Sequence, residues 1–204
     1  MENRTDLPQA EQEEILRLKK ARRNRSELID WLDTIVVSIL VVVLLFTFVF
    51  RMVGIDGTSM EDTLLDGERV LISDVLYTPK RGDIVVISRD YIKKADGSSP
   101  EPIIKRVIAT EGQEVFVDYE NDRVLVDGVV LEEPYIKGFN AQNGFSENPH
   151  VVKKGCVFVM GDHRTVSHDS RATDIGDVDV RYILGRAFVR VYPFSKFEVL
   201  NYEP

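Results

Sequence analysis

The chain has 204 residues, of which 44% are hydrophobic and 29% are charged, and its formal net charge is -8. This length allows one soluble domain with a sizeable core once a membrane segment is set aside. The acidic balance, with no basic patch interleaved with aromatics in the C-terminal three quarters, excludes a nucleic-acid-binding protein. Cys156 is the only cysteine, so an intrachain disulfide is excluded, and the three histidines show no metal-binding spacing. We expect no metal and no cofactor.

The first predicted element is a strongly apolar stretch. Residues 31–50 read WLDTIVVSILVVVLLFTFVF, with no charge between Ile35 and Phe50, and Val53 and Ile55 extend the apolar character further. About 20 residues of helix cross a bilayer core, and only a helix satisfies the backbone of a single span in lipid. The stretch therefore predicts one transmembrane helix over residues 31–50.

The charges around this stretch predict its orientation. Six basic residues lie within nine positions before it, and acidic residues follow it. By the positive-inside rule, residues 1–30 form a cytoplasmic tail, helical from about Gln9, and residues 51–204 form an extracytoplasmic domain of a cell-membrane protein. A cleaved secretory signal is the alternative, but the leader is long and no A-x-A-like site follows.

After residue 51 the chain changes to short runs rich in β-branched residues. Turn residues separate the runs, which predicts a mainly β domain built on an antiparallel sheet, with residues of about 113–155 as a smaller insert within it. Asp127-Gly128 predicts a type I′ hairpin, and residues 91–102 and 138–150 are predicted loops. The runs are RVLIS, DIVVIS, PIIKRVIA, EVFVD, RVLVDGVVLEE, CVFVMGD and RAFVRVYP.

Three segments of this domain carry candidate chemistry, and the first is GTSMEDTLLDG at residues 57–67. Ser59 has small or flexible neighbours, and Gly57 permits the tight turn that backbone N–H groups need in order to face an oxyanion. Taken alone, the segment is more often an ordinary turn.

The second segment is PIIKRVIATEG, in which Lys105 interrupts an otherwise apolar strand and Arg106 points to the opposite face. The pKa of a lysine is ordinarily about 10.4, and desolvation in an apolar cleft lowers it. A neutral amine could then take the proton of Ser59 without any histidine. A lysine that snorkels to solvent from an edge strand is the alternative.

The third segment, VFVMGDHRTVSHDSR at residues 157–171, ends a strand with a dense polar run. Ordering such a loop takes ion pairs and hydroxyl hydrogen bonds, which also fix the geometry near a site. A solvated loop or a divalent-ion loop is the alternative, and the interspersed arginines argue against the ion. The polar residues are Asp162, Arg164, Ser167, Asp169, Ser170 and Arg171.

Together the segments resemble the type I signal peptidase family, the bacterial leader peptidases with a serine/lysine dyad. The family patterns G-x-S-M-x-P-T-L, K-R-V-x-x-x-x-G and G-D-N-R-x-x-S-x-D-S-R are matched by GTSMEDTL, KRVIATEG and GDHRTVSHDSR, and the linking G-D-[IV]-V by GDIV. The resemblance runs from the anchor through about residue 195. Asp62 replaces the usual proline, His163 the usual asparagine, and Ala109, Thr110 and Glu111 the usual Gly-x-Pro.

The resemblance implies a signal peptidase I, a serine endopeptidase that removes signal peptides from secreted preproteins after small residues at the outer membrane face. Ser59 would be the nucleophile and Lys105 the general base. The partners of the protein would be secreted preproteins and membrane lipid. The Ser59 N–H would bind the oxyanion, while Gly57 lacks the hydroxyl that many relatives have there. Ser167 would orient the lysine amine. The pairs Arg106–Asp162 and Arg171–Asp169 would support the site.

Other interpretations stay open at this point. His163 invites a serine/histidine mechanism, although the resemblance makes that position structural. A self-cleaving serine/lysine regulator has a similar β architecture, but the anchor argues against it. A membrane-anchored β domain that binds partners through an inactive site is the alternative from a different class, and the intact Ser59, Lys105 and Ser167 argue against it.

Overall fold

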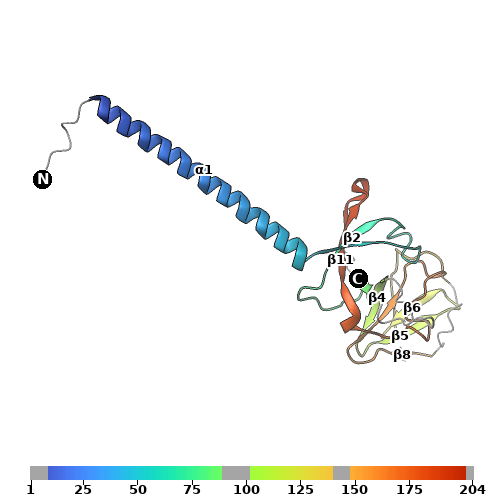
Figure 1. The fold of residues 1–204 in the computed structure, drawn as a ribbon. Helices are drawn as coiled ribbons and strands as arrows, with labels where there is room; N and C mark the ends of the chain where they lie inside the picture. The colour runs from blue at the N-terminus through green and yellow to red at the C-terminus, as the bar shows by residue number, and fades with distance from the viewer. Residues whose placement is uncertain (1–8, 89–101, 140–147, 201–204) are drawn as a thin grey trace, which may run out of the picture. The chain divides into compact units, whose positions relative to one another are not determined.

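The computed structural model describes residues 9–88, 102–139 and 148–200, and Figure 1 shows its ribbon. The predicted loop 91–102 lies almost entirely outside the described residues, as does most of the predicted loop 138–150. The chain divides into two compact units, residues 1–48 and residues 49–204, and each is described by itself. Because residues 49–204 form one unit, the insert of about 113–155 stays a prediction.

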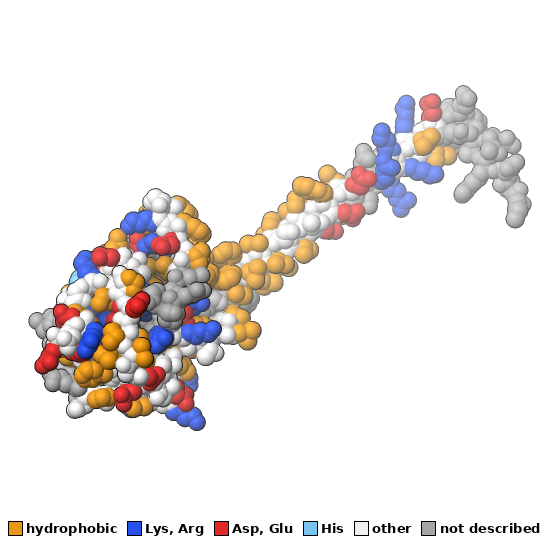
Figure 2. Space-filling model, turned by 180° about the vertical axis from the view of Figure 1, so that it is seen from behind, with side chains coloured by type: hydrophobic (Ala, Val, Ile, Leu, Met, Phe, Trp, Pro, Cys, Tyr) orange, Lys and Arg blue, Asp and Glu red, His pale blue; other side chains and the backbone are white. Residues whose placement is uncertain are grey.

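The first unit is a single helix, α1 (Gln9–Phe48), of 40 residues. It begins where the sequence predicted helix in the tail. Its segment Glu27–Thr47 is long and apolar enough to cross a membrane. Figure 2 shows apolar side chains along this part of the helix, after a first part that carries Lys and Arg. The exposure of these apolar side chains is what a lipid-facing helix requires.

The end of the helix corrects the sequence analysis. α1 ends at Phe48, two residues before the predicted end of the span, and β1 (Arg51–Gly54) begins soon afterwards. Val53, which seemed to extend the apolar stretch, belongs to this strand, and Ile55 is buried in the core of the second unit. An apolar run by itself does not tell a lipid-facing residue from a core residue.

The second unit is mainly β and antiparallel, as predicted, and its strands form two sheets. The larger sheet has eight strands in the order β1-β2-β11-β3-β4-β9-β10, with β12 on β11, and the smaller has the order β7-β6-β5-β8. The elements are β2 (Arg69–Ser73), β3 (Ile84–Ile87), β4 (Ile103–Thr110), β5 (Glu114–Asp118), β6 (Arg123–Val126), β7 (Val129–Val130), β8 (His150–Val151), β9 (Cys156–Met160), β10 (Val178–Asp179), η2 (Val180–Tyr182), β11 (Ile183–Tyr192), η3 (Phe194–Lys196) and β12 (Glu198–Val199).

The predicted hairpin at Asp127-Gly128 is confirmed. β6 pairs with β7, with Val126 opposite Val129. Asp127 has φ 52° and Gly128 has φ 76°. A two-residue type I′ turn needs positive φ at both central positions, which Asp-Gly supplies at little steric cost.

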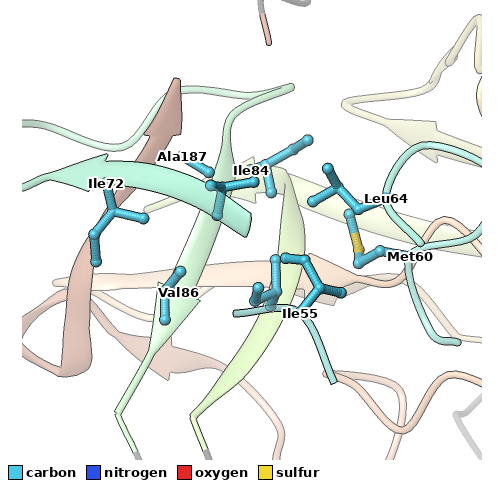
Figure 3. Close-up of a cluster of buried hydrophobic side chains, with 9 residues drawn as sticks. Ile55, Met60, Leu64, Ile72, Ile84, Val86 and Ala187 are labelled. Carbon is cyan, nitrogen blue, oxygen red and sulfur yellow. The ribbon is translucent and has the colours of Figure 1, made fainter. Parts of the chain in front are cut away.

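The core that bears on the candidate site lies under β2, β3, β4 and β11. It contains nine buried residues, among them Ile55, Met60 and Leu64 from the segment that follows β1. In Figure 3, Met60 and Leu64 lie beside each other in this cluster. The segment that carries Ser59 is therefore anchored to the sheet by apolar side chains on both sides of the serine.

Candidate active site

Ser59 and Lys105 lie in direct contact. The Nζ of Lys105 is 2.7 Å from the Oγ of Ser59 and 3.0 Å from the carbonyl oxygen of Ile104. Lys105 projects from β4, which lies between β3 and β9 and is not an edge strand. A snorkelling lysine on an edge strand is therefore excluded.

The surroundings of Lys105 favour its neutral form. Its side chain is buried, with 3% exposed. Burial lowers the pKa of Lys105 to about 8, although the negative charges of Asp169 and Asp162 act in the opposite direction. A buried ammonium is costly because it loses its hydration. A fraction of Lys105 is therefore unprotonated near neutral pH, and its lone pair can accept the proton of a hydroxyl at 2.7 Å.

The turn that presents Ser59 depends on Gly57. Gly57 has φ 94°, a conformation that other residues rarely adopt. Its N–H donates to Oδ1 of Asp66 at 2.9 Å. This backbone conformation explains why a hydroxyl-bearing residue is disfavoured here, and the N–H of Gly57 is already engaged within the turn.

The loop after β9 holds the backbone of Ser59. The N–H of His163 donates to the carbonyl oxygen of Ser59 at 3.1 Å. A Cβ on Gly161 would lie 2.4 Å from that same oxygen and 2.2 Å from Oγ of Ser167. Only glycine allows the two backbones to approach this closely. Gly161 matched the family pattern, but the sequence analysis gave it no role.

His163 supports the turn with its ring as well. Its Nδ1 lies 3.2 Å from the carbonyl oxygen of Thr58 and 3.7 Å from Oε2 of Glu61. The hydrogen bond to Oγ of Ser59 comes from Lys105. This geometry favours a lysine base over the serine/histidine alternative.

Asp162 joins the other two segments. Its carboxylate accepts from Nε and Nη2 of Arg106 at 2.8 and 2.6 Å and from the hydroxyl of Thr63 at 2.5 Å. Arg106 also donates from Nη1 to the carbonyl oxygen of Gly82 at 2.9 Å. Both charged groups are almost fully buried, with side-chain exposures of 3% and 0%. Two charges can be buried together because each completes the hydrogen bonding of the other. Thr63 is a further part of this network that the sequence analysis did not assign.

Asp169 and Arg171 form a second buried pair. Nε and Nη2 of Arg171 donate to the carboxylate of Asp169 at 2.8 and 2.9 Å. Burial alone would raise the pKa of Asp169, but the hydrogen bonds and charge of Arg171, with help from Ser167 and Gly161, hold it below its ordinary value. The arginines pair with carboxylates, which argues against a divalent-ion loop. Among the residues that the structure describes, no group of three or more metal-ligating side chains could hold a metal ion.

Ser167 lies in the same buried network. Its Oγ accepts from the N–H of Gly161 at 3.1 Å, and this N–H also lies 3.0 Å from Oδ2 of Asp169. The N–H of Ser167 donates to the carbonyl oxygen of His163 at 3.1 Å. Ser167 thus lies within the loop that holds Ser59, and its action on the lysine amine stays a prediction.

The departures from the family pattern have identifiable contacts. Oδ1 of Asp62 is 3.2 Å from Nζ of Lys137. Glu111 accepts from the N–H of Gly155 at 2.8 Å, and the N–H of Thr110 donates to Gln113 at 3.0 Å. Each polar replacement therefore has a local partner.

The chain is similar to several known proteins. A family model described as signal peptidase, peptidase S26, matches residues 28–192. Signal peptidase IB of Staphylococcus aureus (strain MRSA252) is 31% identical, covering 88% of this chain and 97% of the relative. Signal peptidase I of Bacillus licheniformis is 30% identical, covering 87% and 96%. The crystal structure of a signal peptidase I from Enterococcus faecalis is 24% identical with a TM-score of 0.42, covering 54% of this chain and 97% of that chain.

Proposed function

Since the chain belongs to the signal peptidase family, peptidase S26, and is thus a hydrolase, we propose that it removes N-terminal signal peptides from secreted preproteins by serine/lysine catalysis. The observation that carries the proposal is the 2.7 Å contact between Nζ of the buried Lys105 and Oγ of Ser59. A nucleophile within hydrogen-bond reach of its base is the geometric requirement for activating a serine.

The first half of the reaction forms an acyl-enzyme. Oγ of Ser59 attacks the scissile carbonyl carbon, and its proton moves to Nζ of Lys105. The resulting ammonium then protonates the leaving amine nitrogen as the C–N bond breaks. The lysine ends this half neutral again, and the N-terminal fragment is held on Ser59 as an ester.

The second half releases that fragment. Lys105 takes a proton from a water molecule, whose oxygen attacks the ester carbon, and then returns a proton to Oγ of Ser59 as the ester bond breaks. One base serves both halves because it is neutral at the start of each. Burial of Lys105, which keeps its pKa at about 8, supports this role near neutral pH.

The developing negative charge needs backbone donors. We assign the N–H of Ser59 as one oxyanion donor, since it belongs to the turn that Gly57 makes possible. Gly57 supplies no hydroxyl, and its N–H already donates to Asp66. A second donor stays unassigned. Removing one such donor typically costs about 100- to 1000-fold in turnover, so a second donor from backbone or water is expected.

The surrounding charged residues serve as support in this proposal. Ser167 orients the amine of Lys105, the pair Arg106–Asp162 holds the second segment to the third, and the pair Arg171–Asp169 orders the third segment itself. Each pair is buried and bidentate, which supports a positional role because such pairs tolerate little displacement.

The membrane anchor gives the proposal a location. The basic residues before the apolar stretch predict a cytoplasmic N-terminus and an extracytoplasmic domain. Ser59 follows the end of the helix at Phe48 by eleven residues, and an extended chain of that length spans at most about 40 Å. The enzyme would then meet a membrane-tethered preprotein at the outer face of the membrane. It would cleave the preprotein after small residues.

The test is cleavage of a purified preprotein by the full-length chain in detergent or lipid. Wild type should cut, while Ser59→Ala and Lys105→Ala should lose at least about 1000-fold, with the folded state of each variant checked by its melting transition. If both variants cut as fast as wild type, the dyad is wrong. If folded wild type fails on several preproteins, an inactive binding module becomes the better account, and cleavage confined to the chain itself would favour a self-cleaving regulator.

A further inference from the structure

A short segment after β7 contacts all three segments of the candidate site. We call residues 133–137 the strap. The chain turns here, with the N–H of Ile136 donating to the carbonyl oxygen of Glu133 at 3.3 Å, and Glu133, Tyr135 and Lys137 each reach a different segment. The sequence EPYIK gave no signal of this role, since nothing in it matches a catalytic pattern.

Glu133 fixes the start of the strap to the loop after β9. Its carboxylate accepts two hydrogen bonds from the guanidinium of Arg164, one of them 2.9 Å long. The two side chains are buried, with exposures of 4% and 0%. Oε1 of Glu133 also accepts from the hydroxyl of Tyr135 at 3.0 Å. This end of the strap is therefore rigid.

Tyr135 covers the residue next to the general base. The guanidinium of Arg106 lies over the Tyr135 ring, 3.8 Å from its centre. Arg106 in turn donates to Asp162 and Thr63. A cation that is already paired with a carboxylate gains a second, face-on contact here. The Tyr135 ring thus packs on the face of the Arg106 guanidinium while its edge is paired with Asp162.

Lys137 ties the strap to the turn that carries Ser59. Its Nζ lies 3.2 Å from Oε2 of Glu61 and 3.2 Å from Oδ1 of Asp62. Its N–H donates to the carbonyl oxygen of Asp162 at 2.9 Å, and its own carbonyl oxygen accepts from the N–H of Arg164 at 3.1 Å. The backbone is thus held by the loop after β9, while the ammonium reaches across to the serine turn.

The charges explain why this contact matters at Asp62. Glu61 and Asp62 are adjacent carboxylates next to the serine turn, and Asp62 stands where the family pattern has a proline that would restrict the backbone. Like charges side by side repel each other, and the single positive charge of Lys137, 3.2 Å from both carboxylates, offsets part of this repulsion. The two carboxylates, Glu61 first, raise the pKa of Lys137, so it stays charged through the neutral range.

We expect loss of the Lys137 ion pairs to affect turnover more than the free energy of unfolding. Lys137 is 42% exposed, and ion pairs of such exposure contribute little to stability. Turnover is more sensitive, because a displacement of about 1 Å at a catalytic group can cost about 100-fold. The N–H of Glu61 closes the turn by donating to the carbonyl oxygen of Thr58 at 3.2 Å, so movement of Glu61 is passed directly to Ser59.

We infer that the strap positions the serine turn for the reaction, and that Lys137 is a positioning residue that acts on Ser59 through Glu61 and Asp62. In this chain the ion pairs of Lys137 restrict the backbone at Asp62, where the ring of the proline in the family pattern would restrict it covalently. The inference rests on the proposed function for its kinetic consequences, but the ordering of the turn is measurable without cleavage.

The experiment uses the full-length chain in detergent with a purified preprotein. Lys137→Met should lower kcat about tenfold, with KM and the pH midpoint of activity within about twofold and 0.3 unit of wild type, because the base is untouched. Lys137→Arg should recover most of the loss. Lys154→Met, which removes an exposed lysine, should behave as wild type. In a Glu61→Gln/Asp62→Asn background, adding Lys137→Met should change kcat no further.

Amide hydrogen exchange supplies the readout that does not depend on cleavage. In Lys137→Met, the amides of Glu61 and Leu64 should exchange faster than in wild type, since the first closes the turn that contains Ser59 and the second closes the turn that follows it. A kcat within twofold of wild type, a loss that Lys137→Arg does not recover, or unchanged exchange at these amides would each overturn the inference. Failure of wild type to cleave would count against the proposed function alone, and the exchange result would still decide the role of the strap.

Discussion

Lys105 and Ser59 are 46 residues apart in the sequence, yet Nζ of one lies 2.7 Å from Oγ of the other. The contact is made in a buried environment, where the charged form of the lysine is disfavoured. Proximity and a lowered pKa together are what a lysine needs to act as a base near neutral pH. The predictions below follow from this contact and from the groups that hold it.

The rate of cleavage should rise with pH through the pKa of Lys105. With a pKa of about 8, roughly a tenth of the lysine is neutral at pH 7, and nearly all of it is neutral at pH 9. We expect kcat/KM for a preprotein to increase about tenfold per unit at low pH and to level off above pH 8 to 9. Steady-state kinetics in buffers of constant ionic strength provide the measurement. A flat profile between pH 6 and 9 would count against a lysine base.

Lys105→Met should be inactive but more stable than wild type at pH 7. The pKa of Lys105 falls from 10.5 in the unfolded chain to about 8 in the folded one, so the buried charge destabilises the fold most at pH below about 8. The shift corresponds to about 3 kcal/mol as an upper value, before the lost hydrogen bonds are subtracted. This penalty fades as the pH rises from about 8 toward 10.5, because the lysine is then neutral in both states.

The measurement is thermal unfolding of both proteins at pH 7 and at pH 10. The melting temperature of Lys105→Met should exceed that of wild type by several degrees at pH 7 and by less at pH 10. Lys154→Met, an exposed change of the same type, should show no difference at either pH. A Lys105→Met variant that melts lower at both values would show that the hydrogen bonds of the amine contribute more to stability than its buried charge costs.

Gly161→Ala should damage the site although it adds only one carbon. The new Cβ would lie 2.4 Å from the carbonyl oxygen of Ser59, and a backbone atom cannot move aside as a flexible side chain does. We expect about 1–3 kcal/mol of destabilisation from overpacking and a fall in kcat of about 100-fold from displacement of the nucleophile. Gly54→Ala is the matched control, since a Cβ there meets nothing within 4 Å. Near-normal turnover of Gly161→Ala would mean that the position of the Ser59 carbonyl is not critical.

Ser167→Ala should lower kcat without unfolding the domain. The N–H of Gly161 would lose one acceptor but would keep Oδ2 of Asp169 at 3.0 Å. The stability loss should therefore be about 1 kcal/mol, or roughly 2–4 °C, whereas an unoriented lysine amine should cost much more in turnover.

Ser170→Ala serves as the comparison for that variant. Its buried hydroxyl accepts from the N–H of Val159 at 2.9 Å, so its removal costs a similar hydrogen bond. Turnover of Ser170→Ala should stay within about twofold of wild type. Equal losses of turnover in the two variants, or a collapsed melting temperature in Ser167→Ala, would make Ser167 a structural residue.

Much of the fold was predictable because its signals are local. Short runs rich in β-branched residues, bounded by turn residues, predicted seven strand runs, all of which contain strands, and Asp127-Gly128 predicted its hairpin. The strands that were missed, β8, β10 and β12, have two residues each, and β1 has four. Such short strands carry no periodicity and are held only by their partners. The apolar run also concealed the end of the helix at Phe48, because lipid and a protein core select the same residue types.

The sequence by itself determined which side chains are available for catalysis: a serine in a glycine turn, a lysine in an apolar strand and a loop dense in ion pairs, in a fixed order behind an apolar helix. Only the tertiary structure decided that Lys105 meets Ser59, that Gly161 lies against the Ser59 backbone, and that Lys137 reaches Glu61 and Asp62. These are contacts between segments far apart in the chain. Their distances follow from the packing of the sheets, and no local pattern of residues records them.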